Sequence, residues 1–567
     1  MFVKITASGN RRYVQLVESY RDDAGRVKKR TVATLGRLDQ LGGELDSVIN
    51  GLMKVAGREL SATASAPPPA VAFESARAFG DVWALTELWN ALGFSQLRRV
   101  FRRTRHTIDV EALIRVMVLN RLCDPDSKLG VLRWLETVAL PQIDVKAITH
   151  QQLLRAMDAL VDHGEAVDAV VAGLLRPMID QDLSVVFYDL TTIRTEGLST
   201  QADDVRQFGM AKEGLVACQF MLGVVQTAEG LPIYHEVFDG NVAETKTLLP
   251  TLKTVLARFP SVRRLILVAD RGLLSLDNLA QLNEVRLAGG QLLEFILAVP
   301  GRRYTEFAEV LAPFHDSRCA GAAEEVIGEL AWNGLRLVVA HEPLRAAQQT
   351  QRRDEQIAEL VAQAEQWAGK LDGQDAGAKH RGRKLSDSGA KARFFHAVSE
   401  AHLSRIIRVD LKSDLFAYDF DERARALAQM MDGKLLLVTN AADLDAGQVV
   451  ERYKSLADIE RGFRVLKSEL EIGPVYHRLP ERIRAHASIC FMALILHRVM
   501  RWRLKAADSA LSPERALETL RRIQHHRVRL NGNAPVTGVS SISAQQAEVL
   551  DALSVKKPVA CEQLTLL

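Results

Sequence analysis

Three acidic side chains lie at positions where carboxylates could share a metal ion: Asp189, Asp270 and Glu460. Asp189 ends the apolar run Val185–Tyr188, and Asp270 ends a second apolar run, Leu265–Ala269. Short, continuous apolar runs are typical of buried strands. If the two strands lie side by side, their C-terminal ends bring both carboxylates to one edge of a sheet. Carboxylates gathered in this way repel one another unless a cation lies between them, and hard Mg²⁺ or Mn²⁺ prefers oxygen ligands.

The third carboxylate, Glu460, is expected on a helix that runs from about Ala446 to Glu469. Tyr453, Glu460 and Lys467 are spaced by seven residues, which is nearly two turns, so on a continuous helix all three project from one face. Such a face offers a metal ligand flanked by an aromatic ring and by a cation that can hold a phosphate as a point charge.

Each of these residues also has a purely structural interpretation. An Asp that follows a strand most often caps a turn or a helix. Glu460 could pair with Arg464, four residues later on a solvated helix. The combination favours a metal site, because two strand-end aspartates are followed by a helical Glu in one chain.

This arrangement resembles the DDE transposases of bacterial insertion sequences, whose core is ribonuclease-H-like. The late helix of one group carries the signature Y-x2-R-x3-E-x6-K, which Tyr453, Glu460 and Lys467 match at the right spacing. Leu456 stands at the Arg position, and this departure removes one phosphate contact that the motif implies. Arg452, Lys454 and Arg464 are the nearby residues that could replace it. The resemblance covers roughly residues 1–500 and extends to Tyr188–Thr192, Gly240–Lys246, Val268–Gly272 and Val475–Arg484.

The resemblance implies an enzyme in which Asp189, Asp270 and Glu460 bind two divalent ions, Mg²⁺ or Mn²⁺. It also implies DNA contacts from Tyr453, Arg464 and Lys467. Water would cut a phosphodiester at the end of the element, and the freed 3′-hydroxyl would attack target DNA. The implied partner is double-stranded DNA, held by a homodimer in the synaptic complex. No nucleotide cofactor is expected, because strand transfer conserves phosphodiester energy and the chain has no G-x-x-x-x-G-K-[ST] loop.

Two alternative functions stay open at this point. One is a domesticated relative that binds DNA without cutting it, for which Leu456 is the hint and against which the intact acidic triad argues. The other is a structure-selective nuclease on the same core. Basic segments at both ends and the long gap between Asp270 and Glu460 favour transposition, because a transposase must hold specific DNA ends.

The elements that must position these residues belong to a chain of 567 residues, 47% of them hydrophobic, which is ample for several cores. The net charge is only +3. Nine basic residues stand against three acidic ones between Lys4 and Arg37, and again between Arg498 and Arg529. Such segments suit a polyanion, although either one alone could be a solvated face.

The cysteines and the apolar runs bear on location. The five cysteines are scattered and lack CxxC spacing, so a reducing cytosol fits better than a disulfide framework or a zinc site. The N-terminus lacks the apolar run of a signal peptide. The longest apolar run, near Ile489–Leu496, is too short to span a bilayer and predicts a buried core helix. We therefore expect a cytoplasmic, nucleoid-associated bacterial protein without a membrane partner.

The pattern of apolar runs, with the resemblance, predicts an α/β fold. We expect a ribonuclease-H-like mixed sheet flanked by helices and interrupted by a β-rich insertion, with a small N-terminal β-module and a helical domain. A helix–loop–helix around Asn120–Lys128 either reads DNA or belongs to an ordinary bundle. The expected segments are a basic β-module (1–60), a linker (61–70), the helical, DNA-binding or bundle domain (71–178), the first part of the core (179–300), the insertion (301–430), the second part of the core with the Glu helix (431–500), and basic C-terminal helices with a tail that has few structure signals after residue 531 (501–567).

Overall fold

The structure is a computed structural model of the chain. It describes residues 1–9, 11–41, 45–57, 71–102, 108–179, 185–197, 204–210, 216–260, 262–270, 276–287, 289–377, 384–530 and 533–558. Two compact units are present. One combines Met1–Glu74 with Val528–Val536, and the other combines Ser75–Arg527 with Thr537–Leu567.

The first unit contains a three-stranded antiparallel sheet formed by β1 (Phe2–Ser8), β2 (Arg11–Arg21) and β3 (Val27–Arg37). The turn between β2 and β3 is closed by Asp22, whose Oδ1 accepts backbone hydrogen bonds from Ala24 at 3.1 Å and Arg26 at 3.0 Å. The two strands around this turn confirm the sequence prediction. Most of β3 is exposed, so its basic side chains face solvent.

In the second unit, nine strands of the described part form one mixed sheet, in the order β11-β12-β15-β10-β9-β5-β7-β6 with β8 paired to β7. Their bounds are β5 (Val185–Arg194), β6 (Gln207–Met210), β7 (Val216–Thr227), β8 (Pro232–Asp239), β9 (Ile266–Ala269), β10 (Glu294–Ala298), β11 (Val326–Trp332), β12 (Leu335–His341) and β15 (Lys434–Thr439). The central strands β5, β9 and β10 are parallel neighbours. Every residue of β9 is buried, which explains its continuous apolar sequence.

A long core helix, α16 (Pro480–Ala506), packs against β8 and against the helices α4 (Val110–Cys123) and α6 (His150–Asp162). Among the described helices it alone has the length and hydropathy of a membrane span, but 89% of its most apolar window is buried inside the protein. The predicted buried core helix is therefore confirmed. Because these helices share one hydrophobic core with the sheet, they hold the sheet and the elements around it together.

The helix–loop–helix expected near Asn120–Lys128 is formed by α4 and α5 (Lys128–Thr137). Ser127 caps α5 by accepting a hydrogen bond from the Gly130 backbone N–H at 3.1 Å. Nearly all of α4 is buried, and α5 buries five of its ten residues. Little of this pair is therefore left facing solvent.

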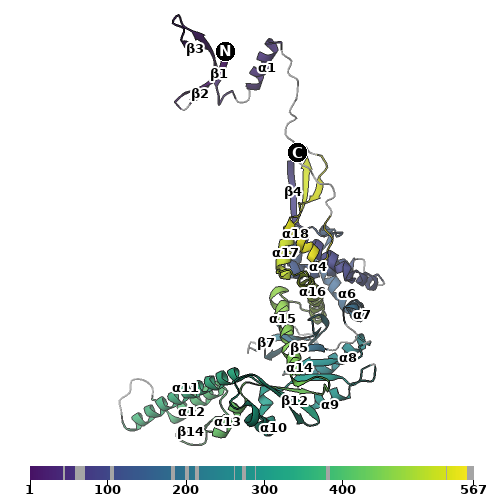
Figure 1. The fold of residues 1–567 in the computed structure, drawn as a ribbon, viewed down its shortest axis with the longest axis vertical. Helices are drawn as coiled ribbons and strands as arrows, with labels where there is room; N and C mark the ends of the chain where they lie inside the picture. Colours follow the sequence, from purple (N-terminus) through teal and green to yellow (C-terminus); the bar gives the residue numbers. More distant parts are fainter. Residues whose placement is uncertain are drawn as a thin grey trace. The chain divides into compact units, whose positions relative to one another are not determined.

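The segment 301–430 differs from the expected β-rich insertion. Its hairpin, β11 with β12, joins the central sheet by pairing with β15. Long helices dominate the remainder of its described part: α11 (Pro343–Asp375), α12 (Asp387–Glu400) and α13 (Glu422–Met431), with two short strands, β13 (Ile407–Val409) and β14 (Tyr418–Phe420). The reason is a second, separate core in which α11 and α12 pack around Phe394. These helices project from the sheet as an arm (Figure 1).

The C-terminal part is more ordered than its sequence indicated. It forms α17 (Pro513–Arg521), β16 (Gln524–Leu530), β17 (Val536–Val539) and α18 (Ala544–Ala552). β17, β16 and β4 (Val71–Ala78) make a further three-stranded sheet. A capping box between Ser543 and Gln546 begins α18, and this Ser-x-x-Gln signal was present in the sequence.

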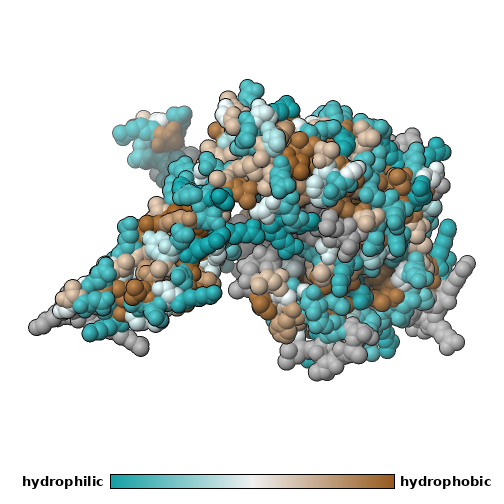
Figure 2. Space-filling view, turned by 90° about the horizontal axis from the view of Figure 1, so that it is seen from below, coloured by the Kyte–Doolittle hydropathy of each residue, from teal (hydrophilic) through white to brown (hydrophobic). Residues whose placement is uncertain are grey.

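The surface is mostly hydrophilic. On the face seen in Figure 2, hydrophilic side chains predominate, and exposed apolar side chains form small, separate patches. The exposed apolar residues of the second unit include Phe208 and Met210 on β6, and Leu411 and Leu415 between β13 and β14. Scattered exposed apolar residues of this kind are normal for a folded protein.

Candidate active site

The structure brings Asp189 and Asp270 to equivalent positions on neighbouring strands. β5 and β9 run parallel, with Tyr188 opposite Ala269, and each aspartate is the next residue along its chain. Neighbouring strands are about 5 Å apart. Side chains alternate along a strand, so both aspartates lie on the face opposite Tyr188. Asp270 directly follows β9 as predicted, whereas Asp189 does not end its strand, because β5 continues to Arg194. The two aspartates are nevertheless at neighbouring positions in the backbone register.

Asp270 is held by a residue from the late helical segment. The hydroxyl of Tyr453, on α14 (Ala446–Lys454), donates a hydrogen bond of 2.9 Å to Asp270 Oδ1. Hydrogen bonds to charged acceptors are among the stronger ones in proteins. Tyr453 was predicted as a DNA contact, whereas here its hydroxyl orients a carboxylate of the candidate site.

The helix that carries Glu460, α15 (Ala457–Arg464), lies over the same face of the sheet as the aspartates. Gln226 on β7 pairs with Phe187, and Phe187 is two residues before Asp189, so all three side chains share one face. Gly462 of α15 approaches Gln226 so closely that an added Cβ would lie 2.5 Å from Gln226 Nε2. The small residue therefore allows α15 to rest on the sheet beside Asp189.

The expected single helix from Ala446 to Glu469 is interrupted. Between α14 and α15, the N–H of Leu456 donates a hydrogen bond of 2.9 Å to the carbonyl of Tyr453. This bond spans three residues, whereas the bonds of an α-helix span four. A π-helical turn, η8 (Val465–Glu469), then follows α15. The prediction of one continuous helix is therefore wrong: Tyr453 lies on α14, Glu460 on α15 and Lys467 in the π turn, which has a wider repeat than an α-helix.

The side chain of Leu456 explains the break in part. It is only 7% exposed and belongs to the main hydrophobic core. The buried Leu456 side chain stabilises this turn. At the same position, the family motif has an Arg that would contact a phosphate. Of the three neighbours that could replace that Arg, Lys454 is paired with Glu325 at 2.9 Å, Arg452 is half-buried and Arg464 is exposed.

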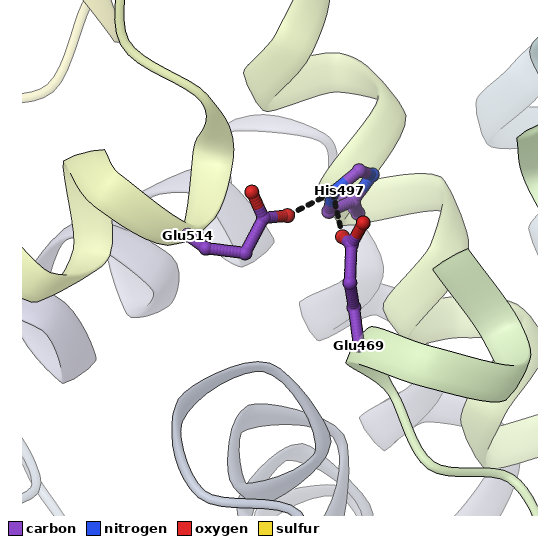
Figure 3. A group of neighbouring side chains, drawn as sticks. All are labelled: Glu469, His497 and Glu514. Atoms are coloured by element: carbon purple, nitrogen blue, oxygen red, sulfur yellow. Dashed lines mark hydrogen bonds and ion pairs between the residues drawn. The ribbon is translucent and has the colours of Figure 1, made fainter. Parts of the chain in front are cut away.

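Glu460 itself is exposed on α15. Among the described residues, the one group of three or more His, Cys, Asp or Glu whose ligand atoms all lie within 4.8 Å is Glu469, His497 and Glu514 (Figure 3). The three predicted carboxylates do not converge to that degree. The structure thus joins Asp189 and Asp270 and places the Glu460 helix on their face, without bringing all three carboxylates within ligand distance.

The face of β5 opposite Asp189 is closed to solvent at Tyr188. Tyr188 is 1% exposed, and its hydroxyl donates to Thr247 Oγ1 at 2.8 Å. Burial raises the pKa of Tyr188 well above its usual value, and the nearby Glu236 and Asp189 carboxylates raise it further. Asp189 Oδ1 accepts the N–H of Leu190 at 2.7 Å. Asp189 itself is only half-buried, so its side chain is partly open to solvent.

Comparison with known protein families agrees with this geometry. A family model described as "Transposase DDE domain" matches residues 180–496, more than half of the chain. The chain belongs to the DDE transposases. A second model, "IS1634 family transposase, N-terminal domain", matches residues 3–65, so this is a transposase of an insertion sequence. No curated protein matches the chain.

Membership of the family sets the reaction class. A DDE transposase cleaves DNA and transfers strands, and members of the family normally use a divalent metal. The DDE domain implies a ribonuclease-H-like core, and the transposase has the required mixed α/β architecture with a large mixed sheet. The paired Asp189 and Asp270 fit a hard divalent ion, because both offer carboxylate oxygens, Asp189 from within β5 and Asp270 directly after β9.

Three features of this region were not predicted. They are the Tyr453–Asp270 hydrogen bond, the close approach at Gly462, and the Glu469–His497–Glu514 group. A Gly inside a helical pattern is a recognised sign of close packing, so Gly462 carried a signal. Glu469, His497 and Glu514 come from three separate elements, and no local spacing relates them.

Proposed function

We propose that Asp189, Asp270 and Glu460 are the catalytic carboxylates of this transposase and that they bind two divalent ions, Mg²⁺ or Mn²⁺. When bound, such a pair of ions supplies an activated water and stabilises the attacking and leaving oxygens of a phosphodiester. The reaction is hydrolysis at the end of the insertion sequence, followed by attack of the new 3′-hydroxyl on target DNA.

The observation that carries this proposal is the register of β5 and β9, which sets Asp189 beside Asp270. Their strands are buried and rigid, so the two carboxylates are held without a mobile loop. α15 rests on the same face through Gly462. Glu460, on the same helix, joins the two aspartates when metal and DNA bind.

Other residues of the late segment have supporting roles in the proposal. Tyr453 orients Asp270 through its hydroxyl. Arg464 is exposed next to Glu460 on α15, and Lys467 lies in the π turn that follows. Their positive charges support a role in holding phosphates of the DNA backbone.

The DNA partner is double-stranded, and we assign recognition of the element's end to the basic N-terminal module (1–60) rather than to the helical region (71–178). β3 exposes Lys28, Lys29 and Arg30 along one edge, whereas α4 is nearly all buried. Lysines and arginines on an exposed sheet supply the salt-dependent contacts that position a protein on DNA. We further propose a homodimer in the synaptic complex, acting at the nucleoid in the bacterial cytoplasm.

The proposed segments follow the same division of labour. The core parts (179–300 and 431–500) hold the carboxylates, the insertion (301–430) separates Asp270 from Glu460, and the C-terminal part (501–567) braces α16. The predicted linker (61–70) lies outside the residues that the structure describes.

The test is mutation of each carboxylate with matched controls. We expect Asp189→Asn, Asp270→Asn and Glu460→Gln each to abolish Mg²⁺-dependent cleavage of element-end DNA while leaving its binding intact. Asp443→Asn and Glu451→Gln are suitable controls, because both residues are exposed and lie near the same elements. A carboxylate variant that cleaves at close to the parent rate would remove that residue from the triad.

A further inference from the structure

A buried histidine lies between two glutamates, and the three residues come from η8, α16 and α17 (Figure 3). His497 Nε2 lies 2.7 Å from Glu514 Oε1 and 3.0 Å from Glu469 Oε2. The His497 side chain is 4% exposed, while those of Glu469 and Glu514 are 33% and 44% exposed. Both carboxylates thus lie close to one nitrogen of a ring that is almost fully buried.

The positions of these residues make the contact mechanically important. Glu469 is the last residue of the π turn η8, which follows α15 and contains Lys467. His497 lies in the core helix α16, and Glu514 lies in the first turn of α17. The segment that carries Glu460 and Lys467 is therefore tied at its C-terminal end to the long core helix α16.

The distances favour a proton over a metal ion at the centre of the group. Zinc ligands lie about 2.0–2.2 Å from the ion, which sets tetrahedral donors roughly 3.3 Å apart. The 2.7 Å between His497 Nε2 and Glu514 Oε1 is instead the length of a charge-assisted hydrogen bond.

The charges around His497 agree with an imidazolium. Burial by itself disfavours the charged ring, but the hydrogen bonds and charges of Glu469 and Glu514 outweigh it and raise the pKa of His497 above its usual value. The pKa of Glu514 is lowered well below its usual range, because contacts with His497, Glu469 and Ser512 outweigh the effect of burial. Glu469 from η8 and Glu514 from α17 are the charged groups with the largest effect on the ring.

We propose that His497 is a positioning residue: as an imidazolium, it ties the π turn to α16 and α17 and thereby holds Glu460 and Lys467 over the catalytic face of the sheet. This inference rests on the proposed function of Glu460. Loss of the proton leaves two carboxylates facing each other around a neutral ring, and their repulsion frees the end of the segment.

The direction of the pH effect follows from the raised pKa. The folded-state pKa of His497 lies above its usual value, so the tie is complete below that usual value and is lost as the pH rises through the folded-state pKa. Cleavage by the parent protein should therefore lose the benefit of His497 on the alkaline side. Hydroxide-dependent steps rise with pH in every variant, so the informative quantity is the ratio of parent to variant rates.

The experiment uses full-length protein and element-end DNA and compares the parent with His497→Gln, His497→Lys and Glu514→Gln. At about pH 6 we expect His497→Gln to cleave roughly tenfold or more slowly than the parent, because misplacement of a catalytic group by about 1 Å can cost 10²-fold. Near pH 9 the two rates should approach each other. His497→Lys keeps a positive charge that does not titrate in this range, so it should restore cleavage with little pH dependence of the ratio.

Glu518→Gln is the matched control for Glu514→Gln, because Glu518 lies one turn later on α17 and pairs with Arg515. Hydrogen exchange of residues 465–470 provides a readout independent of chemistry: we expect faster exchange in His497→Gln than in the parent at about pH 6. Inactive Asp189→Asn should show the parent's slow exchange.

The outcomes separate this inference from the proposed function. If His497→Gln lowers cleavage by the same factor at every pH, or leaves exchange of the π turn unchanged, the positioning role is wrong while the triad stands. If the carboxylate variants cleave normally, the triad is wrong, and the exchange measurement still reports the tie. A stoichiometric divalent metal in the purified protein that disappears in His497→Gln and persists in Asp189→Asn would overturn the proton-based account.

Discussion

Gly462→Ala tests how closely the Glu460 helix must approach the sheet. The added Cβ would lie 2.5 Å from Gln226 Nε2 and 3.0 Å from an Arg498 guanidinium nitrogen. Ordinary non-bonded contacts are about 3.5–4.0 Å, so the methyl group is roughly 1 Å too close. Gln226 is fully buried and Arg498 is 3% exposed, so neither neighbour can simply swing into solvent, and α15 must move away.

We expect Gly462→Ala to change the free energy of unfolding only slightly but to lower the rate of DNA cleavage strongly. Overpacking costs about 1–3 kcal/mol, but replacing a helical Gly by Ala returns about 1 kcal/mol of helix propensity. The free energy of unfolding should therefore fall by only about 0–2 kcal/mol. A displacement of Glu460 by about 1 Å should lower single-turnover cleavage by roughly 10- to 100-fold.

The assay is single-turnover cleavage of labelled element-end DNA at saturating protein, with stability measured in parallel by chemical denaturation. Gly173→Ala on α7 (Gly164–Leu175) is the matched control, because a Cβ there meets nothing within 4 Å. Gln226→Ala should partly rescue Gly462→Ala by removing the crowded amide, whose two polar atoms have no hydrogen-bond partner in the described part of the chain. A Gly462→Ala variant that cleaves at the parent rate would refute the close docking of α15.

Two further predictions concern single side chains. Tyr453→Phe removes the hydrogen bond to Asp270 and should raise the Mg²⁺ concentration needed for half-maximal cleavage by about 10–100-fold, as is usual for partners of metal ligands. Tyr476→Phe, at a position that is 69% exposed, is its control, and equal Mg²⁺ dependence in both variants would argue against an orienting role. Lys128 is buried, and burial, with a smaller effect from Arg121, lowers its pKa to about 7. Because the unfolded chain then binds the extra proton between that value and the ordinary 10.5, the free energy of unfolding should rise with pH across this window. Lys128→Met should remove that rise and stabilise the protein at pH 7, whereas Met at the exposed Lys146 should change neither; denaturation midpoints at about pH 7 and pH 9.5 decide the matter.

The strands of the core were predictable because buried strands have continuous apolar sequences. Val185–Tyr188 and Leu265–Ala269 predicted both strands, and Asp270 follows β9 as expected. Asp189 does not end β5, because pairing with β7 extends that strand to Arg194, and such pairing is a long-range property. The chemistry of the site was therefore visible before its geometry.

The late helical segment was less predictable. Ser455 and Leu456 are not helix breakers, so no local sequence signal predicted that α14 ends at Lys454. The buried position of Leu456 depends on apolar contacts with the rest of the core. The π turn at Val465–Glu469 depends in the same way on tertiary contacts. Asn333–Gly334, between β11 and β12, is a strong local hairpin signal, but the membership of this hairpin in the central sheet depends on β15, roughly a hundred residues away.

The central claim is that Asp189, Asp270 and Glu460 share divalent metal during DNA cleavage. The most direct measurement is anomalous diffraction from crystals of the transposase bound to element-end DNA and soaked in Mn²⁺. The account predicts manganese peaks between Asp189 and Asp270, with Glu460 drawn in from α15 as a further ligand. Manganese found instead among Glu469, His497 and Glu514, with none between the aspartates, would contradict it.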